Sequence, residues 1–117
     1  MTPEEFIAAT RAEFPELSAE LDDDEGLFYL QVGSLARHTQ AAIDDGDRAE
    51  VKRQFEFARK ADLAGDAEVE NALGVAYIEH LNFQDGKRHR SWAWDLLPES
   101  LQSVGRSLGV EPRGPRR

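Results

Sequence analysis

The chain has 117 residues, a length at which a single hydrophobic core is the commonest arrangement. It contains no cysteine, and its formal net charge is −9. The lack of cysteine excludes a disulfide framework and a thiolate metal site, and the negative charge disfavours binding to nucleic-acid phosphates.

The negative charge is concentrated in the first half of the chain. Thirteen of the 23 acidic residues lie in the first fifty positions, together with only three basic residues. The densest groups are Asp22, Asp23, Asp24 and Glu25, and then Asp44, Asp45 and Asp47. Because an acidic face attracts basic proteins, we expect a basic protein partner and no nucleic acid.

The first five residues include two glutamates and lack the basic start and apolar run of a signal peptide. No apolar stretch approaches the roughly 20 residues that a membrane-spanning helix needs. We therefore expect a cytoplasmic protein without membrane contact.

The first predicted helix covers residues 3–14. Thr2 is its capping residue and Pro3 occupies the first helical position, where proline is favoured. Pro15 ends or kinks this helix, and a short second turn through residues 15–21 follows. A longer helix is predicted from about residue 26 to 44. Its apolar positions follow a spacing of three and four, at Phe28, Val32, Leu35, Thr39, Ala42 and Ile43.

Two Gly-Asp pairs, Gly46-Asp47 and Gly65-Asp66, each precede a new run of helical periodicity. In each pair the glycine can end one helix in the left-handed conformation, and the aspartate can cap the next helix. The pairs therefore predict an αα-hairpin of helices 47–64 and 66–81.

The second helix of this hairpin is apolar nearly all round, which is typical of a central helix. We expect four residues of the hairpin to be buried: Phe55, Ala72, Leu73 and Ala76. Gly74, in a helix interior where glycine is unfavourable, is expected to allow the close approach of another helix.

The last third of the chain predicts two short helices after a polar loop. Ser91 can cap the first of them, and Pro98 can start a second that runs to about residue 108. Residues 109–117, rich in proline and arginine, are expected to form a disordered tail. The whole pattern predicts an all-α fold: residues 1–108 as a single domain, in an antiparallel bundle of five or six helices with a central αα-hairpin.

Residues 87–90 and the two tryptophans form a basic, aromatic stretch. The arginines of this loop are expected to pair with nearby acids. Because Trp92 and Trp94 are two positions apart on a helix, we expect one of them in the core and the other exposed as an anchor for a partner.

Catalytic and metal-binding patterns are not found. Glu79 and His80 could do acid–base chemistry, but adjacent helical residues point about 100° apart, so we expect both to be partly buried and hydrogen-bonded. The histidines His38, His80 and His89 lie on separate predicted elements without the spacing of metal ligands. We expect no metal, no cofactor and no enzymatic activity.

Several short motifs spread along the chain carry a family likeness. They are Phe14-Pro15-Glu16-Leu17, Gly46-Asp47, Phe55, Ala58, Gly65-Asp66, Asn71-Ala72, Tyr77-Ile78-Glu79-His80-Leu81 and Leu96-Leu97-Pro98. In these residues the chain resembles a family of small, acidic, uncharacterised bacterial proteins, some of which are encoded beside polymorphic toxins and treated as immunity proteins. The resemblance implies a helical fold and supplies no catalytic residue.

Charge, size and resemblance together predict a cytosolic immunity protein that binds and neutralises a cognate toxin domain by covering its active site. The predicted partner-binding residues are Asp22, Asp23, Asp24, Glu25, Tyr29, Asp44, Asp45 and Asp47, with Tyr29 as the aromatic anchor beside the acidic run. Two alternatives stay open: a helical adaptor or regulatory domain unrelated to toxins, and an enzyme in which the fold brings Glu79, His80 and His38 together.

Overall fold

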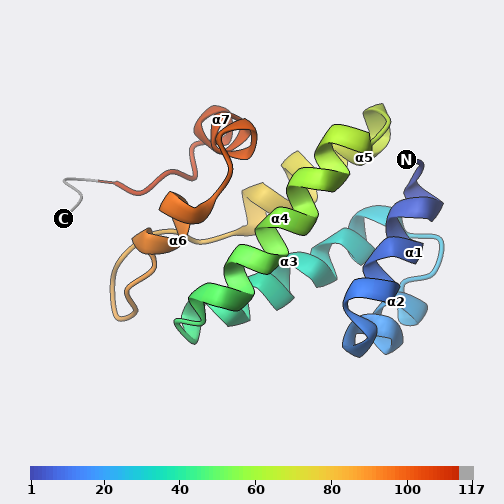
Figure 1. Ribbon diagram of the computed structural model, residues 1–117, viewed down its shortest axis with the longest axis horizontal. Helices are drawn as coiled ribbons and strands as arrows, with labels where there is room; N and C mark the ends of the chain where they lie inside the picture. Colours follow the sequence, from blue (N-terminus) through green and yellow to red (C-terminus); the bar gives the residue numbers. More distant parts are fainter. Residues whose placement is uncertain (114–117) are drawn as a thin grey trace.

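Residues 1–113 are described by the computed structural model, and they contain helices and no strand (Figure 1). The α-helices are α1 (Pro3–Glu13), α2 (Ser18–Asp23), α3 (Phe28–Asp44), α4 (Arg48–Ala64), α5 (Ala67–Ala72), α6 (Ser91–Leu96) and α7 (Glu99–Leu108). The all-α prediction is confirmed. The described part of the chain has seven α-helices rather than five or six, because α2 forms a short helix of its own where the sequence indicated only a short turn.

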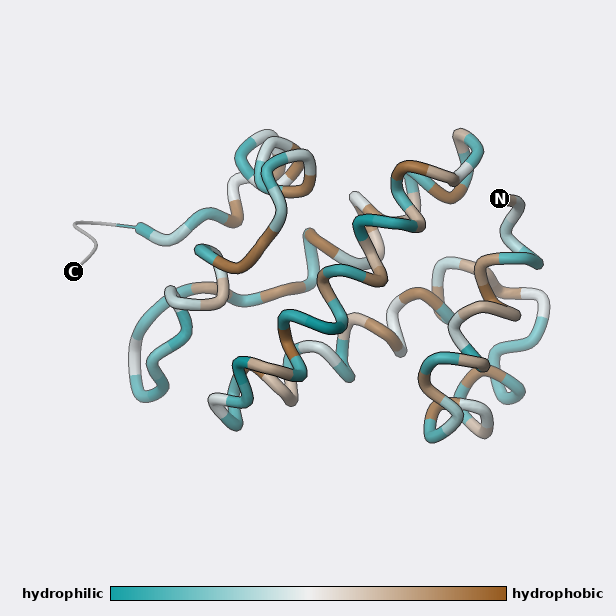
Figure 2. Tube along the Cα trace, in the orientation of Figure 1, coloured by the Kyte–Doolittle hydropathy of each residue, from teal (hydrophilic) through white to brown (hydrophobic). Residues whose placement is uncertain are grey.

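The centre of the molecule consists of α3, α4 and the helical segment that begins with α5. A tight turn joins α3 to the antiparallel α4, and α5 then runs back beside α3 (Figure 1). α1 and α2 lie at one end of α3, whereas α6 and α7 cover the other side of the central segment. Hydrophilic and hydrophobic residues alternate along α4 at helical spacing, as expected of a helix with one buried face (Figure 2).

The predicted helix starts are present as side-chain caps. Thr2 and Glu5 form a capping box on α1, in which the Glu5 N–H donates to Thr2 Oγ1 at 3.2 Å. Asp47 accepts from the Glu50 N–H at 3.2 Å, and Asp66 accepts from the Val69 N–H at 2.9 Å. These caps explain why the predicted and observed starts of both hairpin helices agree closely.

The two hairpin glycines act differently. Gly46 has a φ of 70°, which is the left-handed conformation that we expected. Gly65 does not: its φ is −74° and its ψ is 148°, an extended conformation. Glycine is required here because a side chain has no room: a Cβ would lie 2.7 Å from Val69 Cγ1 and 2.8 Å from the Ala61 carbonyl oxygen.

The predicted helix 66–81 is helical but not a regular α-helix. After α5 it continues as a π-helical turn (Leu73–Tyr77) and then a 3-10 turn (Ile78–His80). Gly74 in the π-helical turn does not mark a close helix approach, because a Cβ there would meet only Val104 Cγ1, at an ordinary 3.6 Å. The close approach occurs at Gly105 of α7, where a Cβ would lie 2.8 Å from Trp94 Cζ3.

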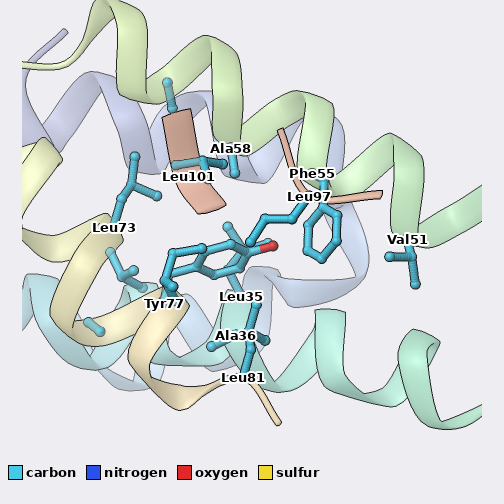
Figure 3. Close-up of a cluster of buried hydrophobic side chains, with 14 of the residues drawn as sticks. Leu35, Ala36, Val51, Phe55, Ala58, Leu73, Tyr77, Leu81, Leu97 and Leu101 are labelled. Carbon is cyan, nitrogen blue, oxygen red and sulfur yellow. The ribbon is translucent and has the colours of Figure 1, made fainter. Parts of the chain in front are cut away.

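The core lies between α3, α4 and the π-helical turn and is closed by residues near α6 and α7 (Figure 3). Its central side chains include Leu35, Val51, Phe55, Ala58, Leu73, Tyr77, Leu81, Leu97 and Leu101. The predicted burial of Phe55, Ala72, Leu73 and Ala76 is confirmed.

A fully buried polar cluster sits inside this core. The Thr39 hydroxyl lies 2.6 Å from Gln54 Oε1 and 2.9 Å from the Tyr77 hydroxyl. The same hydroxyl lies 3.1 Å from the Leu35 carbonyl oxygen, while Gln54 Nε2 has no hydrogen-bond partner among the residues described. Burial raises the pKa of Tyr77, so this phenol stays neutral and can donate a hydrogen bond.

The predicted tail, residues 109–117, begins with five described residues that are held against the molecule. Gly109 ends α7 with a φ of 75°, and Gln84 then contacts the backbone beyond it. The Gln84 amide donates to the Glu111 carbonyl oxygen at 2.9 Å and accepts from the Arg113 N–H at 2.9 Å. Residues 114–117 of the predicted tail lie outside the described residues.

Candidate partner-binding surface

The first acidic group spans the end of α2 and the start of the turn that leads to α3, and we call it the acidic loop (residues 22–25). The α-helix α2 ends at Asp23, and Gly26, with a φ of 83°, turns the chain toward α3. Asp22, Asp23 and Glu25 are exposed, and Asp24 is half-buried. Backbone hydrogen bonds from the Glu25 N–H to the Asp22 oxygen and from the Leu27 N–H to the Asp24 oxygen keep the loop compact.

Most of the negative charge in the acidic loop is not compensated within the described part of the molecule. Asp22 pairs with Arg11 of α1 at 2.6 Å. The carboxylates of Asp23, Asp24 and Glu25 form no ion pair with any described residue. The acidic loop therefore presents three free carboxylates next to one that ties it to α1.

Exposed apolar side chains adjoin the acidic loop, and the sequence analysis missed two of them. Leu27 is 55% exposed and Leu30 is 54% exposed, although both are large hydrophobic residues. Their positions lie off the buried stripe of α3, and that offset is the signal that could have identified them. Tyr29, predicted as an anchor, is 39% exposed, and its hydroxyl accepts from Asn71 Nδ2 at 2.6 Å.

The second acidic group lies at the opposite end of α3, at the turn into α4. A helix of 17 residues is about 25 Å long, so the length of α3 separates the two acidic groups. Asp44 is used internally: Arg90 Nε donates to its carboxylate at 2.7 Å, and this bond lowers the pKa of Asp44. Asp47 caps α4, and Asp45 is exposed.

In the loop of residues 87–90, Arg90 pairs with an acid, Asp44, as expected from the sequence. Besides the Arg90 contact, the Arg88 guanidinium donates to the Asp44 carbonyl oxygen at 3.1 Å. The start of α6 differs from the expectation: Ser91 is not its cap. Instead the Asp85 carboxylate accepts from the N–H groups of Arg90 and Ser91, and these bonds lower the pKa of Asp85 to about 2.

The prediction of one exposed tryptophan is wrong, since Trp92 is 8% exposed and Trp94 is 4% exposed. Trp92 Nε1 donates to the His89 carbonyl oxygen, and the Arg48 guanidinium lies 4.6 Å from its ring centre. Trp94 packs against Phe83 with a centroid distance of 5.3 Å and against α7. Both faces of α6 are therefore covered, which a single-helix pattern could not indicate.

Of the candidate acid–base residues, Glu79 and His80 lie together and His38 lies elsewhere. Glu79 and His80 are exposed rather than partly buried, and they border a shallow depression beside residues 109–113. His38 does not line that depression: its Nε2 lies 3.1 Å from Glu16, and its ring meets Phe14 edge-on. Among residues 1–113 no group of three or more His, Asp or Glu residues could hold a metal ion.

No helix of the described chain has both the length and the apolar character required to span a bilayer.

The profile of a family described as a domain of unknown function, DUF7674, matches residues 7–108. The chain belongs to the DUF7674 family. No curated protein and no solved structure shows significant similarity to it.

The DUF7674 match covers α2 to α7 and most of α1, so the acidic loop, Leu27 and Leu30 fall inside the family domain. The capping residue Thr2 and the segment from Gly109 onward lie outside it. An uncharacterised helical family, as the motifs indicated, is thereby confirmed.

Proposed function

We propose that this DUF7674 protein binds a basic protein partner through a docking surface made of the acidic loop together with Leu27, Tyr29 and Leu30. The partner that fits best is a cognate bacterial toxin domain, which the protein neutralises by covering its active site. The observation that carries the proposal is that three carboxylates without an ion pair to any described residue are followed, within a few positions of the chain, by two half-exposed leucines.

The two parts of the docking surface have different physical roles. Exposed carboxylates steer a basic partner and raise the association rate. Because each leucine is only about half exposed, burying the rest of it on binding contributes about 0.8–1.6 kcal/mol before the costs of association. Because Tyr29 and Leu30 already lie in the first turn of α3 and Tyr29 is tied to Asn71, little ordering of the surface is needed.

A toxin domain fits this chemistry because domains that act on nucleic acids need a basic cleft. An acidic surface of similar size would complement that cleft and exclude its substrate. Blocking by occlusion requires no catalytic group on the inhibiting protein, in agreement with a surface built from carboxylates and apolar side chains.

The test mixes this protein with the purified protein domain that is encoded next to its own gene. We expect a complex that suppresses the toxic activity, and the double variant Leu27→Ala/Leu30→Ala should weaken binding by at least about tenfold. Leu63→Ala is the matched control, because Leu63 is 69% exposed but lies on α4, outside the docking surface.

If Leu63→Ala weakened binding as much as Leu27→Ala/Leu30→Ala does, the result would contradict the docking surface. A tight complex that leaves the toxic activity intact would instead indicate the adaptor function, in which the same surface recruits a basic protein without inhibiting it.

A further inference from the structure

A cavity of about 440 Å³ lies next to the acidic loop, between α1, the start of α3 and the first turn of α5. Three glutamates from different elements border it: Glu4 of α1, Glu25 of the acidic loop and Glu68 of α5. Leu27 and Leu30 do not line it. The cavity is therefore distinct from the exposed apolar part of the docking surface, although the acidic loop borders both.

The glutamates at the rim are not neutralised. None of Glu4, Glu25 and Glu68 forms a side-chain ion pair or hydrogen bond with any residue of the described chain. The one cation in the lining, Arg11, is already paired with Asp22 at 2.6 Å and donates to the Ser18 carbonyl oxygen at 3.3 Å. The rim thus carries a net negative charge that a cationic group would balance.

The inner wall of the cavity is apolar and fixed. Ile7 and Phe28 are half-buried there, and the Phe28 ring meets the buried Phe6 ring edge-on at 5.9 Å. Gln31 also lines the cavity although it is only 6% exposed. Its Nε2 donates to the Leu21 carbonyl oxygen at 3.0 Å, while its Oε1 accepts no hydrogen bond from a described residue.

We infer that this cavity is a socket for one arginine side chain of the partner. The inference rests on the proposed function and adds the chemistry that would fix the partner's position. An arginine presents a cationic, five-donor head on an apolar stem. The head matches three free carboxylates and a free amide oxygen, and the stem and guanidinium face match Ile7 and the Phe28 ring.

The socket can be tested without knowing the partner, by NMR titration of the ¹⁵N-labelled protein with N-acetyl-arginine amide. We expect saturable shifts of the amides that line the cavity, with a dissociation constant on the order of a millimolar. The neutral isostere N-acetyl-citrulline amide should bind at least about tenfold more weakly, because it lacks the charge that the rim attracts.

Charge-matched variants separate the socket from general attraction to an acidic protein. Glu4→Gln/Glu68→Gln should weaken binding of N-acetyl-arginine amide at least about fivefold. The control Glu79→Gln/Glu99→Gln removes the same charge from exposed positions outside the cavity and should change binding less than about twofold. Retained amide dispersion and melting temperature verify that each variant folds.

Three outcomes would overturn the socket: no shifts, shifts that spread over the whole surface without saturating, or equal weakening by both double variants. Failure of the proposed function would look different. The variant Leu27→Ala/Leu30→Ala should keep its affinity for N-acetyl-arginine amide, so loss of the partner with an intact socket counts against the docking surface alone.

Discussion

At the scale of single residues, the buried cluster of Thr39, Gln54 and Tyr77 is the least ordinary part of the core. The Thr39 hydroxyl has one hydrogen, yet it lies within hydrogen-bond distance of two carbonyl oxygens and a phenol. It is the only contact that joins the polar groups of Gln54 and Tyr77 within the described core. Leaving a buried polar group without a partner costs more free energy of folding than a hydrogen bond contributes on balance.

Thr39→Val should therefore destabilise the protein by about 1–3 kcal/mol, since it leaves Gln54 and the Tyr77 hydroxyl buried without partners. The change keeps the side-chain shape, so packing contributes little. Tyr77→Phe is the comparison: it removes a polar group instead of orphaning one and should cost about 0.5–1.5 kcal/mol. Urea unfolding of both variants measures the difference, and a Thr39→Val protein as stable as the original would contradict it.

At the scale of elements, close contacts rather than helix propensity decide how α6 and α7 sit. Trp94 fills the space above Gly105, which explains both the burial of this tryptophan and the need for glycine in the middle of α7. Gln102 Nε2 also donates to the Trp94 carbonyl oxygen at 2.8 Å, so the two helices are joined by packing and by a hydrogen bond.

Gly105→Ala should destabilise the protein by about 1–3 kcal/mol, because its Cβ would lie 2.8 Å from the ring of Trp94, a side chain that is itself buried. Gly74→Ala is the matched control, since the added Cβ would have only an ordinary contact at 3.6 Å. We expect its stability to be unchanged or raised, as alanine is favoured over glycine in helices. Thermal unfolding compares the stability of the two variants. Equal losses of stability would argue against the close approach of Trp94 to Gly105.

At the scale of the whole molecule, whose net charge is −9, the two densest acidic groups have different uses. The turn between α3 and α4 uses its charge internally, through Arg88 and Arg90. The acidic loop leaves most of its charge to solvent, and its one ion pair, between Arg11 and Asp22, is largely exposed and so contributes little to stability.

Neutralising the acidic loop as Asp22→Asn, Asp23→Asn, Asp24→Asn and Glu25→Gln should leave the melting temperature nearly unchanged or slightly raised, since repulsion among the carboxylates is relieved. The same variant should associate more slowly with the basic partner. The difference should shrink as salt rises, because screening shortens the range of the attraction. Association as fast as that of the original protein at low salt would exclude the acidic loop from docking.

Local signals account for the parts of the fold that the sequence analysis predicted correctly. The start of α4 follows from the Asp47 cap, its end lies just before Gly65, and the path of α3 follows from its apolar spacing. Burial of Phe55 and Leu73 follows from the same periodicity. These features depend on neighbours within about one helical turn, so one sequence is enough to indicate them.

The sequence by itself determined the helical class, the main helix limits and the acidic character of the chain, because capping, periodicity and charge are properties of neighbouring residues. Only the tertiary structure decided that both tryptophans are buried, that Asp44 accepts a hydrogen bond from Arg90, and that Glu4, Glu25 and Glu68 border one cavity. Each of these facts joins residues far apart in the chain, and their positions follow from packing between helices, which no local pattern specifies.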